Sequence, residues 1–277
     1  MITASVISVP KRPGLATIMS VHARADADAD RELPLARITH ATLYDKVYDE
    51  LRNALMNGRF LPGEVLTIRG VAQALGTSVM PVREALRRLA AERAIQFHAD
   101  RSIRVPLLDE HAFDELLQMR LLLEGRAAAA AAQRMSASEL NDARDINQAY
   151  ANPADGSTAM ARLLANRHFH FAIYRAARAP LLLSLIEMMW LQSGPYLMIP
   201  IRQRTPDEVS AYLAAGAVHH RDLLDALAKR DSAAAETAIQ ADISDAARAY
   251  RDALAADFDE ENADEESAED SERRGRR

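Results

Sequence analysis

The sequence contains no cysteine, and this absence excludes disulfide bonds and thiolate metal ligands. No apolar run reaches the length of about 20 residues that a transmembrane helix needs, so no membrane span is expected. The N-terminal stretch lacks the apolar core of a secretory signal, because Lys11, Arg12, Arg24 and several acids interrupt it. Glycine is scarce, with 10 in 277 residues, and β-branched runs are few. These absences predict a cytoplasmic protein built mainly from helices.

Charge is distributed unevenly along the chain. Residues 257–277 carry ten acidic residues and four arginines, which account for the whole net charge of −6. Residues 40–107 carry ten Lys and Arg against seven Asp and Glu, a net charge of +3. The acidic average therefore does not exclude a nucleic-acid partner. Composition predicts disorder for residues 1–36 and for the acidic tail 257–277, since neither has enough apolar side chains to form a core.

The basic segment has the pattern of two short helices joined by a tight turn. A preceding helix ends at Asn57-Gly58. The next one, in LTIRGVAQALG, ends at Gly76, a residue that suits the position just after a helix. Ser78 can cap the helix that follows, and Pro81 falls in its first turn, where a missing N–H costs nothing. This order predicts a helix-turn-helix, whose second helix can enter a DNA major groove.

The second helix of that motif, in GTSVMPVREALRRL, has an apolar face and a basic face. Val82, Leu86 and Leu89 are spaced to pack inward, which leaves Arg83 and Arg87 facing outward, one turn apart. The planar fork of arginine suits the O6 and N7 atoms of guanine or a pair of phosphate oxygens. A solvated basic face on an ordinary helix pair would look similar.

The run AIQFHADRSIRVP predicts two short strands around a turn at Ala99–Arg101, which would form the wing of a winged helix. The full order of helix, turn, helix pair, arginine helix and wing favours DNA binding over a solvated surface, because chance rarely produces all of these parts together.

The stretch LRNALMNGRFLPGEVLTIRGVAQALGTSVMPVREALRRLAAERAI resembles the DNA-binding domain of the GntR family of bacterial transcription regulators. Its strongest signatures are the NG-x(3)-PG turn, the ALG turn and the helix PVREALRRLAAE. The resemblance implies that Arg69 and Arg83 contact operator DNA and that the wing enters the minor groove. The expected DNA-contacting residues are Arg69, Ser78, Val79, Met80, Arg83, Arg87 and Arg101.

This chain departs from the family pattern at two places. The family usually has Ser-Arg-Thr-Pro where this chain has Ser78-Val79-Met80-Pro81, so a base-reading arginine is absent. Val79 and Met80 can still contact a thymine methyl group, and we expect a shifted operator preference. The family wing often carries Arg-Gly where this chain has Arg101-Ser102, so the resemblance does not define the conformation of the wing turn.

The chain from about residue 108 to 256 reads as six or seven helices, which predicts an all-helical bundle. Fused behind the winged helix, this bundle resembles the FCD ligand-binding domain of the FadR-like GntR subfamily. The expected fold class is mainly α. The expected parts are a disordered segment 1–36, a winged helix-turn-helix domain 37–107, an all-helical effector-binding and dimerisation domain 108–256, and the tail 257–277.

The bundle contains residues that match a family metal site. FCD domains that bind a metal use one Asp and three His, and the matching positions here hold Asn166, His170, His220 and Asp242. Two ligands differ from the family pattern, Asp to Asn and His to Asp, so the number of carboxylates is unchanged. The resemblance implies a divalent ion such as Zn, Ni or Mn.

A different reading of these histidines remains open. His170 and His220 could be core histidines that donate to backbone carbonyls. Their neighbours His168 and His219 are expected to point to other faces.

Arg120 matches a position where family members often carry an arginine near the effector pocket, and a surface salt bridge with Glu124 would explain it equally well.

The resulting hypothesis is a dimeric regulator, most simply a repressor, which binds double-stranded operator DNA and a small carboxylate effector. Two alternatives are a metal-dependent enzyme with an accessory winged-helix module, and an interaction protein that acts through its acidic tail. Against the enzyme alternative, the sequence near the histidines contains no catalytic motif. Operator binding after deletion of residues 257–277 would exclude the interaction protein.

Overall fold

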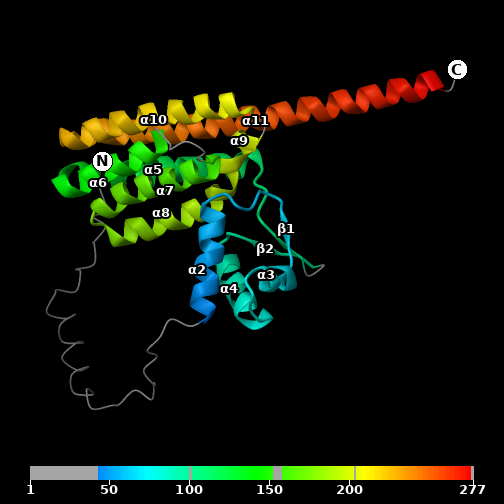
Figure 1. Ribbon diagram of the computed structural model, residues 1–277, viewed down its shortest axis with the longest axis horizontal. Coiled ribbons are helices and arrows are strands. Elements are labelled where there is room, and N and C mark those ends of the chain that lie inside the picture. Colours follow the sequence, from blue (N-terminus) through cyan, green and yellow to red (C-terminus); the bar gives the residue numbers. More distant parts are fainter. Residues whose placement is uncertain (1–42, 100–101, 152–157, 203, 276–277) are drawn as a thin grey trace, which may run out of the picture. The chain divides into compact units, whose positions relative to one another are not determined.

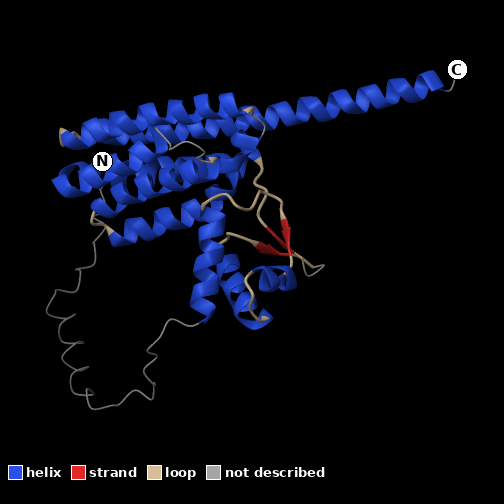
Figure 2. Ribbon diagram, viewed as in Figure 1, coloured by secondary structure: helices blue, strands red, loops and turns tan. Residues whose placement is uncertain are grey.

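The computed structural model describes residues 43–99, 102–151, 158–202 and 204–275, the last 22 of them as backbone only. Helices dominate these residues, and the strands form one small antiparallel sheet (Figure 2). The fold class is mainly α, with an N-terminal winged helix and a C-terminal helical bundle, as the sequence predicts. None of the described helices is both long enough and apolar enough to cross a membrane.

The winged helix occupies the first part of the described chain (Figure 1). Its elements are α2 (Leu43–Met56), β1 (Val65–Leu66), α3 (Ile68–Ala74), α4 (Val79–Ala91), β2 (Gln96–Phe97) and β3 (Ile103–Arg104). Strand β3 lies between β1 and β2, antiparallel to both, with Ile103 opposite Leu66 and Phe97. Both predicted wing strands are present. The third strand, β1, was not predicted from the sequence. The predicted turn residue Arg101 lies outside the described residues.

The tight turn between α3 and α4 depends on its glycine. Gly76 has a φ of +61°, in the left-handed region that favours glycine after a helix. The N–H of Thr77 donates to the carbonyl of Ala72 at 3.0 Å and closes the end of α3. Ser78 occupies the cap position of α4 with extended backbone, but its side chain makes no capping hydrogen bond. The helix boundaries predicted around this turn are confirmed.

The second part of the chain is a helical bundle. Its elements are α5 (Glu110–Arg134), α6 (Ala137–Ala151), α7 (Ala159–Ala176), α8 (Pro180–Ser193), the 3-10 helix η2 (Gly194–Met198), α9 (Ile199–Arg202), α10 (Pro206–Ala228) and α11 (Ser232–Gly275). Helix α11 packs along both α5 and α10, and α6 packs along α7 (Figure 1). The prediction of an all-helical bundle is confirmed.

Local capping fixes where several of these helices begin. Ser136 and Glu139 form the predicted capping box, with Ser136 N–H donating to the Glu139 carboxylate at 2.9 Å and Glu139 N–H to Ser136 Oγ at 3.2 Å. The predicted cap of the last helix is also present, since Asp231 Oδ1 accepts from the N–H groups of Ala233 and Ala234. A further capping box starts α10.

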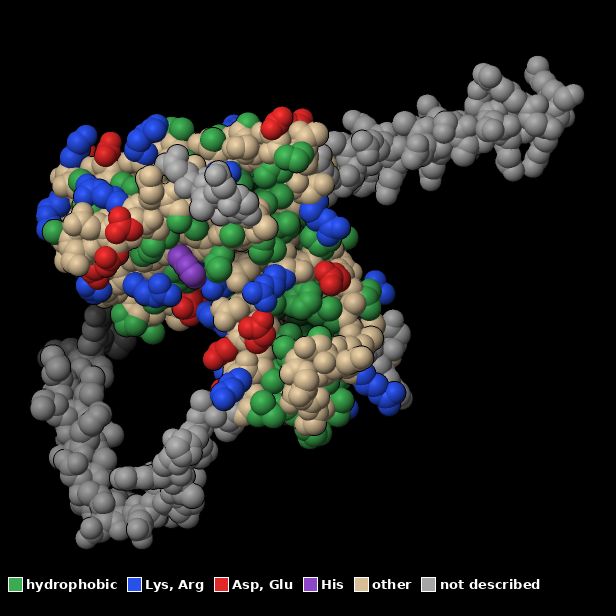
Figure 3. Space-filling view, viewed as in Figure 1, with side chains coloured by type: hydrophobic (Ala, Val, Ile, Leu, Met, Phe, Trp, Pro, Cys, Tyr) green, Lys and Arg blue, Asp and Glu red, His purple; other side chains and the backbone are tan. Residues whose placement is uncertain are grey.

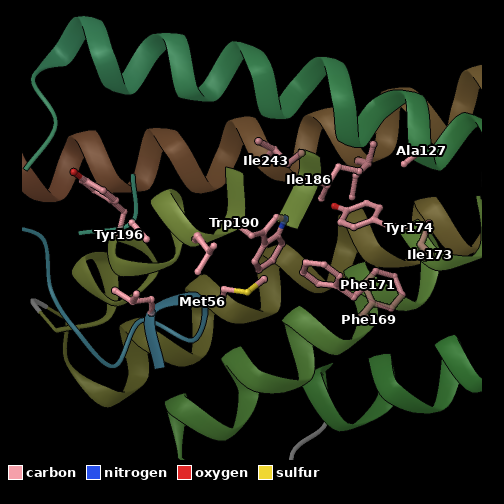
Figure 4. Close-up of a cluster of buried hydrophobic side chains, with 14 of the residues drawn as sticks. Met56, Ala127, Phe169, Phe171, Ile173, Tyr174, Ile186, Trp190, Tyr196 and Ile243 are labelled. Atoms are coloured by element: carbon pink, nitrogen blue, oxygen red, sulfur yellow. The ribbon is translucent and has the colours of Figure 1, made fainter. Parts of the chain in front are cut away.

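The chain has few aromatic residues, and many of them lie in the bundle core. Trp190 of α8 lies among aromatic side chains of α7, including Phe171 and Tyr174 (Figure 4). Trp190, Phe169 and Tyr174 are at most 1% exposed. Burial of side chains of this size contributes about 2–3 kcal/mol each to folding. These two helices are therefore firmly packed, which positions the polar residues between them.

Close contacts join α2 of the winged helix to the bundle. A Cβ atom on Gly194 would collide with the carbonyl oxygen of Leu55, so only glycine permits this approach. Nearby, Arg52 pairs with Glu187 of α8 at 2.9 Å. The same hydrophobic core includes residues of α2, α4 and the bundle. Because such a core is closely packed, a displacement of η2 would also shift the winged helix.

The acidic tail differs from the sequence-based expectation. Residues 257–277 were expected to be disordered, but α11 continues to Gly275. Its last part is rich in Glu and Arg, which favour helix, and contains no proline or glycine before Gly275. The expectation considered only the lack of apolar side chains and neglected this intrinsic preference.

Candidate nucleic-acid interface and metal centre

The outward face of α4 carries two arginines. Arg83 and Arg87 are exposed, whereas Val82, Leu86 and Leu89 are fully buried. The division into two faces that the spacing predicts is confirmed. Since the two arginines are four residues apart on one helix, their guanidinium groups project to the same side and can reach neighbouring groups on DNA.

The N-terminal end of α4 is exposed and partly apolar. Val79 is 38% exposed and Met80 is 60% exposed, and Ser78 and Arg69 are exposed as well. Figure 3 shows hydrophobic side chains beside Lys and Arg at the end of the winged helix that carries α3 and α4. A helix N-terminus also presents backbone N–H groups that favour phosphate. All four of these predicted contact residues are accessible to a DNA duplex.

The arginines of α4 differ in their protein contacts. Arg87 pairs with Glu84 at 2.8 Å. An exposed pair of this kind contributes little to stability, so Arg87 can leave Glu84 for another partner. Arg88 instead lies over the ring of Tyr48, 3.7 Å from its centroid, and pairs with Glu92. Burial, followed by the hydrogen bond to Glu92, raises the pKa of Tyr48 to about 12, so its hydroxyl stays protonated and bound. Arg88 therefore braces α4 against α2.

Three helices of the bundle bring metal-ligating side chains together. His170 of α7, His220 of α10 and Asp242 of α11 place one ligand atom each within 4.8 Å of one another. The Nε2 atom of His170 lies 3.3 Å from Asp242 Oδ2, and the Nε2 atom of His220 lies 3.7 Å from Asp242 Oδ1. Two ligand atoms at tetrahedral positions around zinc are about 3.4 Å apart. The spacing of the cluster suits a divalent ion.

The chemistry of His220 fits the same ion. Its side chain is fully buried, and its Nε2 atom has no hydrogen-bond partner among the described residues. Burial lowers the pKa of His220 to about 3, so the ring is neutral and Nε2 offers a lone pair or a single N–H. Burial raises the pKa of Asp242, but its contacts with His170 and His220 outweigh burial and lower the pKa, so this carboxyl keeps its charge. Neutral imidazoles and a carboxylate are the donors that zinc, nickel or manganese accept.

Asn166, the fourth predicted ligand, lies one turn before His170 on α7. It lines a cavity of about 210 Å³ together with Asp242, Tyr150, Tyr212 and Arg248. This cavity has room for a small organic molecule next to the cluster. Asn166 thus lies beside Asp242, one of the three clustered ligands.

The two neighbouring histidines differ from each other. His168 is exposed, as expected. The expectation that His219 faces away from the site is wrong, because His219 lines the cavity beside Asp242 and its Nε2 atom lies 2.7 Å from Asp245 Oδ2. The cavity extends along α10 and α11, so adjacent residues of α10 reach different parts of it.

Arg120 makes the predicted pair with Glu124, but inside the bundle and not on the surface. Its Nε atom donates to Glu124 Oε1 at 2.6 Å, and its guanidinium lies 5.0 Å from the centre of the Trp190 ring. Burial lowers the pKa of Arg120, but the charge and hydrogen bonds of Glu124 outweigh it and raise the pKa. Arg120 also lines a second, smaller cavity of about 30 Å³ with Phe113 and Tyr196. The arginine is charged and accessible from that cavity.

Residues that the sequence did not single out orient the two buried histidines. The Nδ1 atom of His220 lies 2.9 Å from Asn147 Oδ1, and the Nδ1 atom of His170 lies 3.0 Å from the hydroxyl of Tyr174. These partners are side chains and not the backbone carbonyls of the alternative reading. Tyr174 follows His170 by four residues, a spacing that could have indicated it. Asn147 comes from α6, and nothing in its local sequence marks it.

Two family models match this chain. The model described as bacterial regulatory proteins, gntR family, matches residues 43–105, and the FCD domain model matches residues 115–245. Among curated relatives, the HTH-type transcriptional regulator McbR of Escherichia coli (strain K12) is 28% identical over 177 residues, which cover 64% of this chain and 80% of McbR. The probable D-xylose utilization operon transcriptional repressor of Paenarthrobacter nicotinovorans is 30% identical over 203 residues, 73% of this chain and 86% of that protein.

Solved structures agree in fold. The structure of E. coli McbR/YncC has a TM-score of 0.70 and 26% identity, and the match covers 77% of this chain and 99% of that one. A putative transcriptional regulator GntR from Rhodococcus sp. RHA1 has a TM-score of 0.59 at 22% identity, covering 75% of this chain and 96% of that one. The latter similarity supports the arrangement of helices and strands.

Proposed function

Since this chain belongs to the gntR family of bacterial regulatory proteins, with an FCD domain, and is a DNA-binding transcription regulator, we propose that it represses transcription as a homodimer whose operator affinity depends on a small carboxylate effector. The relatives are transcription regulators and not enzymes, so the alternative of a metal-dependent enzyme is wrong. We keep the domain limits 37–107 and 108–256, within which both family matches fall.

The DNA-binding surface of this proposal is the exposed face of α3 and α4. Arg69, Arg83 and Arg87 supply positive charge, and Val79 and Met80 supply apolar contact to thymine methyl groups. Ser78 has a hydroxyl that is not used by the helix cap and can donate to phosphate. Arg101, outside the described residues, would contribute from the wing. Operator DNA as the partner implies action in the cytoplasm.

The observation that carries the effector part of the proposal is the Nε2 atom of buried His220, which has no hydrogen-bond partner among the described residues. It lies 3.7 Å from Oδ1 of Asp242, a residue that lines the cavity of about 210 Å³. Asn166, His170, His220 and Asp242 would hold a Zn, Ni or Mn ion, and that ion would supply open coordination positions for a carboxylate. His219 and Arg248 line the same cavity and offer further donors to an acid. Arg120 offers a charged group in the neighbouring cavity.

A path for the signal runs through η2. Tyr196 of η2 lines the cavity that holds Arg120, and its hydroxyl contacts the segment Pro106–Leu108, which follows the wing. An effector that moved Tyr196 would displace the attachment of the winged helix. Effector and operator would then favour different arrangements of the same protein, which is the requirement for allosteric regulation.

An exposed apolar face on α5 and α8 supports the proposed dimer. Leu122 is 63% exposed and Leu181 82% exposed, and Met119 and Leu185 are exposed on the same two helices, which pack against each other. Large exposed apolar side chains grouped on adjacent helices are typical of an interface between subunits. Burying this face between two copies would place two winged helices on one symmetric operator.

The experiment that tests this proposal has two steps. Genomic DNA fragments bound by the purified protein are sequenced to find the operator. The affinity for that operator is then measured by fluorescence anisotropy at fixed salt, with and without small carboxylates that relate to the neighbouring genes. We expect at least one acid to weaken binding about 5- to 150-fold, and a chelator to abolish its effect. Specific operator binding that no acid and no chelator changes would refute the effector part.

A further inference from the structure

We propose that Asn147 and Tyr174 are positioning residues, which hold the Nδ1–H groups of His220 and His170 and thereby turn both Nε2 lone pairs toward Asp242. This inference rests on the proposed binding of a metal. It concerns two residues outside the predicted ligand set, each of which orients one of the two histidines. Two buried imidazoles must both present Nε2 if one ion is to reach them and Asp242 together.

The proton of Tyr174 determines the state of His170. Glu124 is fully buried and accepts hydrogen bonds from the guanidinium of Arg120, from Trp190 Nε1 at 2.9 Å and from the Tyr174 hydroxyl. All three groups donate to Glu124, and the hydroxyl of Tyr174 carries only one proton. The Tyr174 hydroxyl therefore donates to Glu124 and can only accept a hydrogen bond from His170, whose Nδ1 lies 3.0 Å away. The Nε2 atom of His170 is left as the ligand atom.

Asn147 performs the same task for His220 by a different route. Its amide oxygen lies 2.9 Å from Nδ1 of His220, as an acceptor for an N–H. The opposite tautomer would put the proton on Nε2, where Asp242 Oδ1 is 3.7 Å away, beyond hydrogen-bond range. The ring also stacks on Phe169, with centroids 4.2 Å apart, and lies 4.8 Å from the Tyr150 ring, so it cannot rotate freely to another partner.

These contacts extend the site beyond the three helices that carry the cluster. Asn147 adds α6, and Glu124 adds α5. Loss of such an outer partner commonly weakens metal binding 10- to 100-fold, because the ligand loses its orientation and some basicity. We therefore expect the metal affinity to depend on residues that never touch the ion.

The test uses the full-length protein, freed of metal by a chelator, with Zn²⁺ and Mn²⁺ as probes in competition with an indicator dye. Asn147→Leu removes the acceptor at similar size, and should bind each metal 10- to 100-fold more weakly. Asn147→Asp restores an acceptor and should bind at least as tightly as the wild type. The adjacent exposed Gln148→Leu is the matched control and should leave affinity unchanged. Tyr174→Phe should weaken binding like Asn147→Leu, with thermal unfolding used to verify that each variant folds.

A second readout works without metal. Long-range ¹H–¹⁵N NMR spectra of the metal-free protein report which ring nitrogen of each histidine carries the proton. We expect Nδ1–H for His220 in the wild type, and a change of tautomer at His220 only in Asn147→Leu. An Nε2–H tautomer at His220 in the wild type, or unchanged metal affinity in Asn147→Leu, would overturn the positioning role. A wild type that binds neither metal would instead refute the metal part of the proposed function.

Discussion

The hydroxyl of Tyr196 accepts a hydrogen bond of 2.8 Å from the backbone N–H of Leu108. The two residues are 88 positions apart in the chain, one in η2 of the bundle and the other just after the wing. The same hydroxyl donates to the carbonyl of Pro106 at 3.2 Å. Because Tyr196 also lines the cavity that holds Arg120, one side chain contacts both the proposed effector region and the segment that carries the winged helix.

Removing that hydroxyl should reduce the communication between the two sites. Tyr196→Phe keeps the ring packed against Phe113 but loses both hydrogen bonds. We expect the coupling between effector and operator binding to fall by up to about 1–3 kcal/mol, the net value of two such hydrogen bonds. Anisotropy titrations with and without effector measure this coupling. Coupling equal to that of the wild type would exclude Tyr196 from the path.

Arg69 and Arg83 should each contribute to operator affinity. Both are exposed, and if each makes a bidentate contact to a base, substitution by Ala should cost about 1–3 kcal/mol of binding free energy. Arg144→Ala, an exposed arginine of α6, is the control and should bind the operator normally. Normal affinity of both variants, measured by anisotropy at fixed salt, would remove these residues from the interface.

Val79 should influence which operator is preferred. It is exposed at the start of α4, where the family usually has a base-reading arginine, and it offers only apolar contact. Val79→Arg should change the consensus selected from random duplexes, and added attraction to phosphate should tighten binding overall. The conservative Val79→Ile variant should select the wild-type consensus. If the arginine variant also selected it, position 79 would read no base.

The buried histidines should be required for metal. His170→Ala and His220→Ala each remove a ligand atom and should lose metal, while exposed His168→Ala should keep it. His219→Ala should also keep the metal, since His219 lines the cavity but lies outside the cluster, and should weaken effector binding instead. Elemental analysis after gentle purification measures the content.

Metal loss should also lower stability. An ion that binds only the folded protein stabilises it, by about 2.7 kcal/mol when its free concentration is 100 times the dissociation constant. Thermal unfolding of the wild type should therefore shift upward with added metal, and that of His220→Ala should not. Equal metal content in all four histidine variants would reduce the cluster to ordinary core residues.

Charge on the exposed apolar face should separate the proposed dimer. Leu122→Glu on α5 or Leu185→Glu on α8 would place a carboxylate in the interface, where burial of an unpaired charge costs several kcal/mol. Light scattering should then report one chain of 30.5 kDa in place of two. Val218→Glu alters an exposed apolar residue of α10 and should leave the dimer intact. A dimer that survived both leucine substitutions would place the interface elsewhere.

The local features of this protein follow from its sequence. Gly76, with the Ser78 cap position and Pro81 after it, defines the turn of the helix-turn-helix, because backbone conformations and helix ends depend on neighbouring residues. The spacing within α4 likewise determines which of its side chains face inward. Asn166 and His170 share a face of α7 for the same reason, since four residues make about one turn.

Only the tertiary structure decided how separate helices meet. The packing of α11 against α5 and α10 brings Asp242 to His170 and His220, and the packing of α6 brings Asn147 to His220. It also turned the expected surface pair of Arg120 into a buried one, because the period of a helix tells which side chains share a face and not what covers that face. Coverage depends on contacts between residues far apart in the chain, and no pattern within a single helix records them.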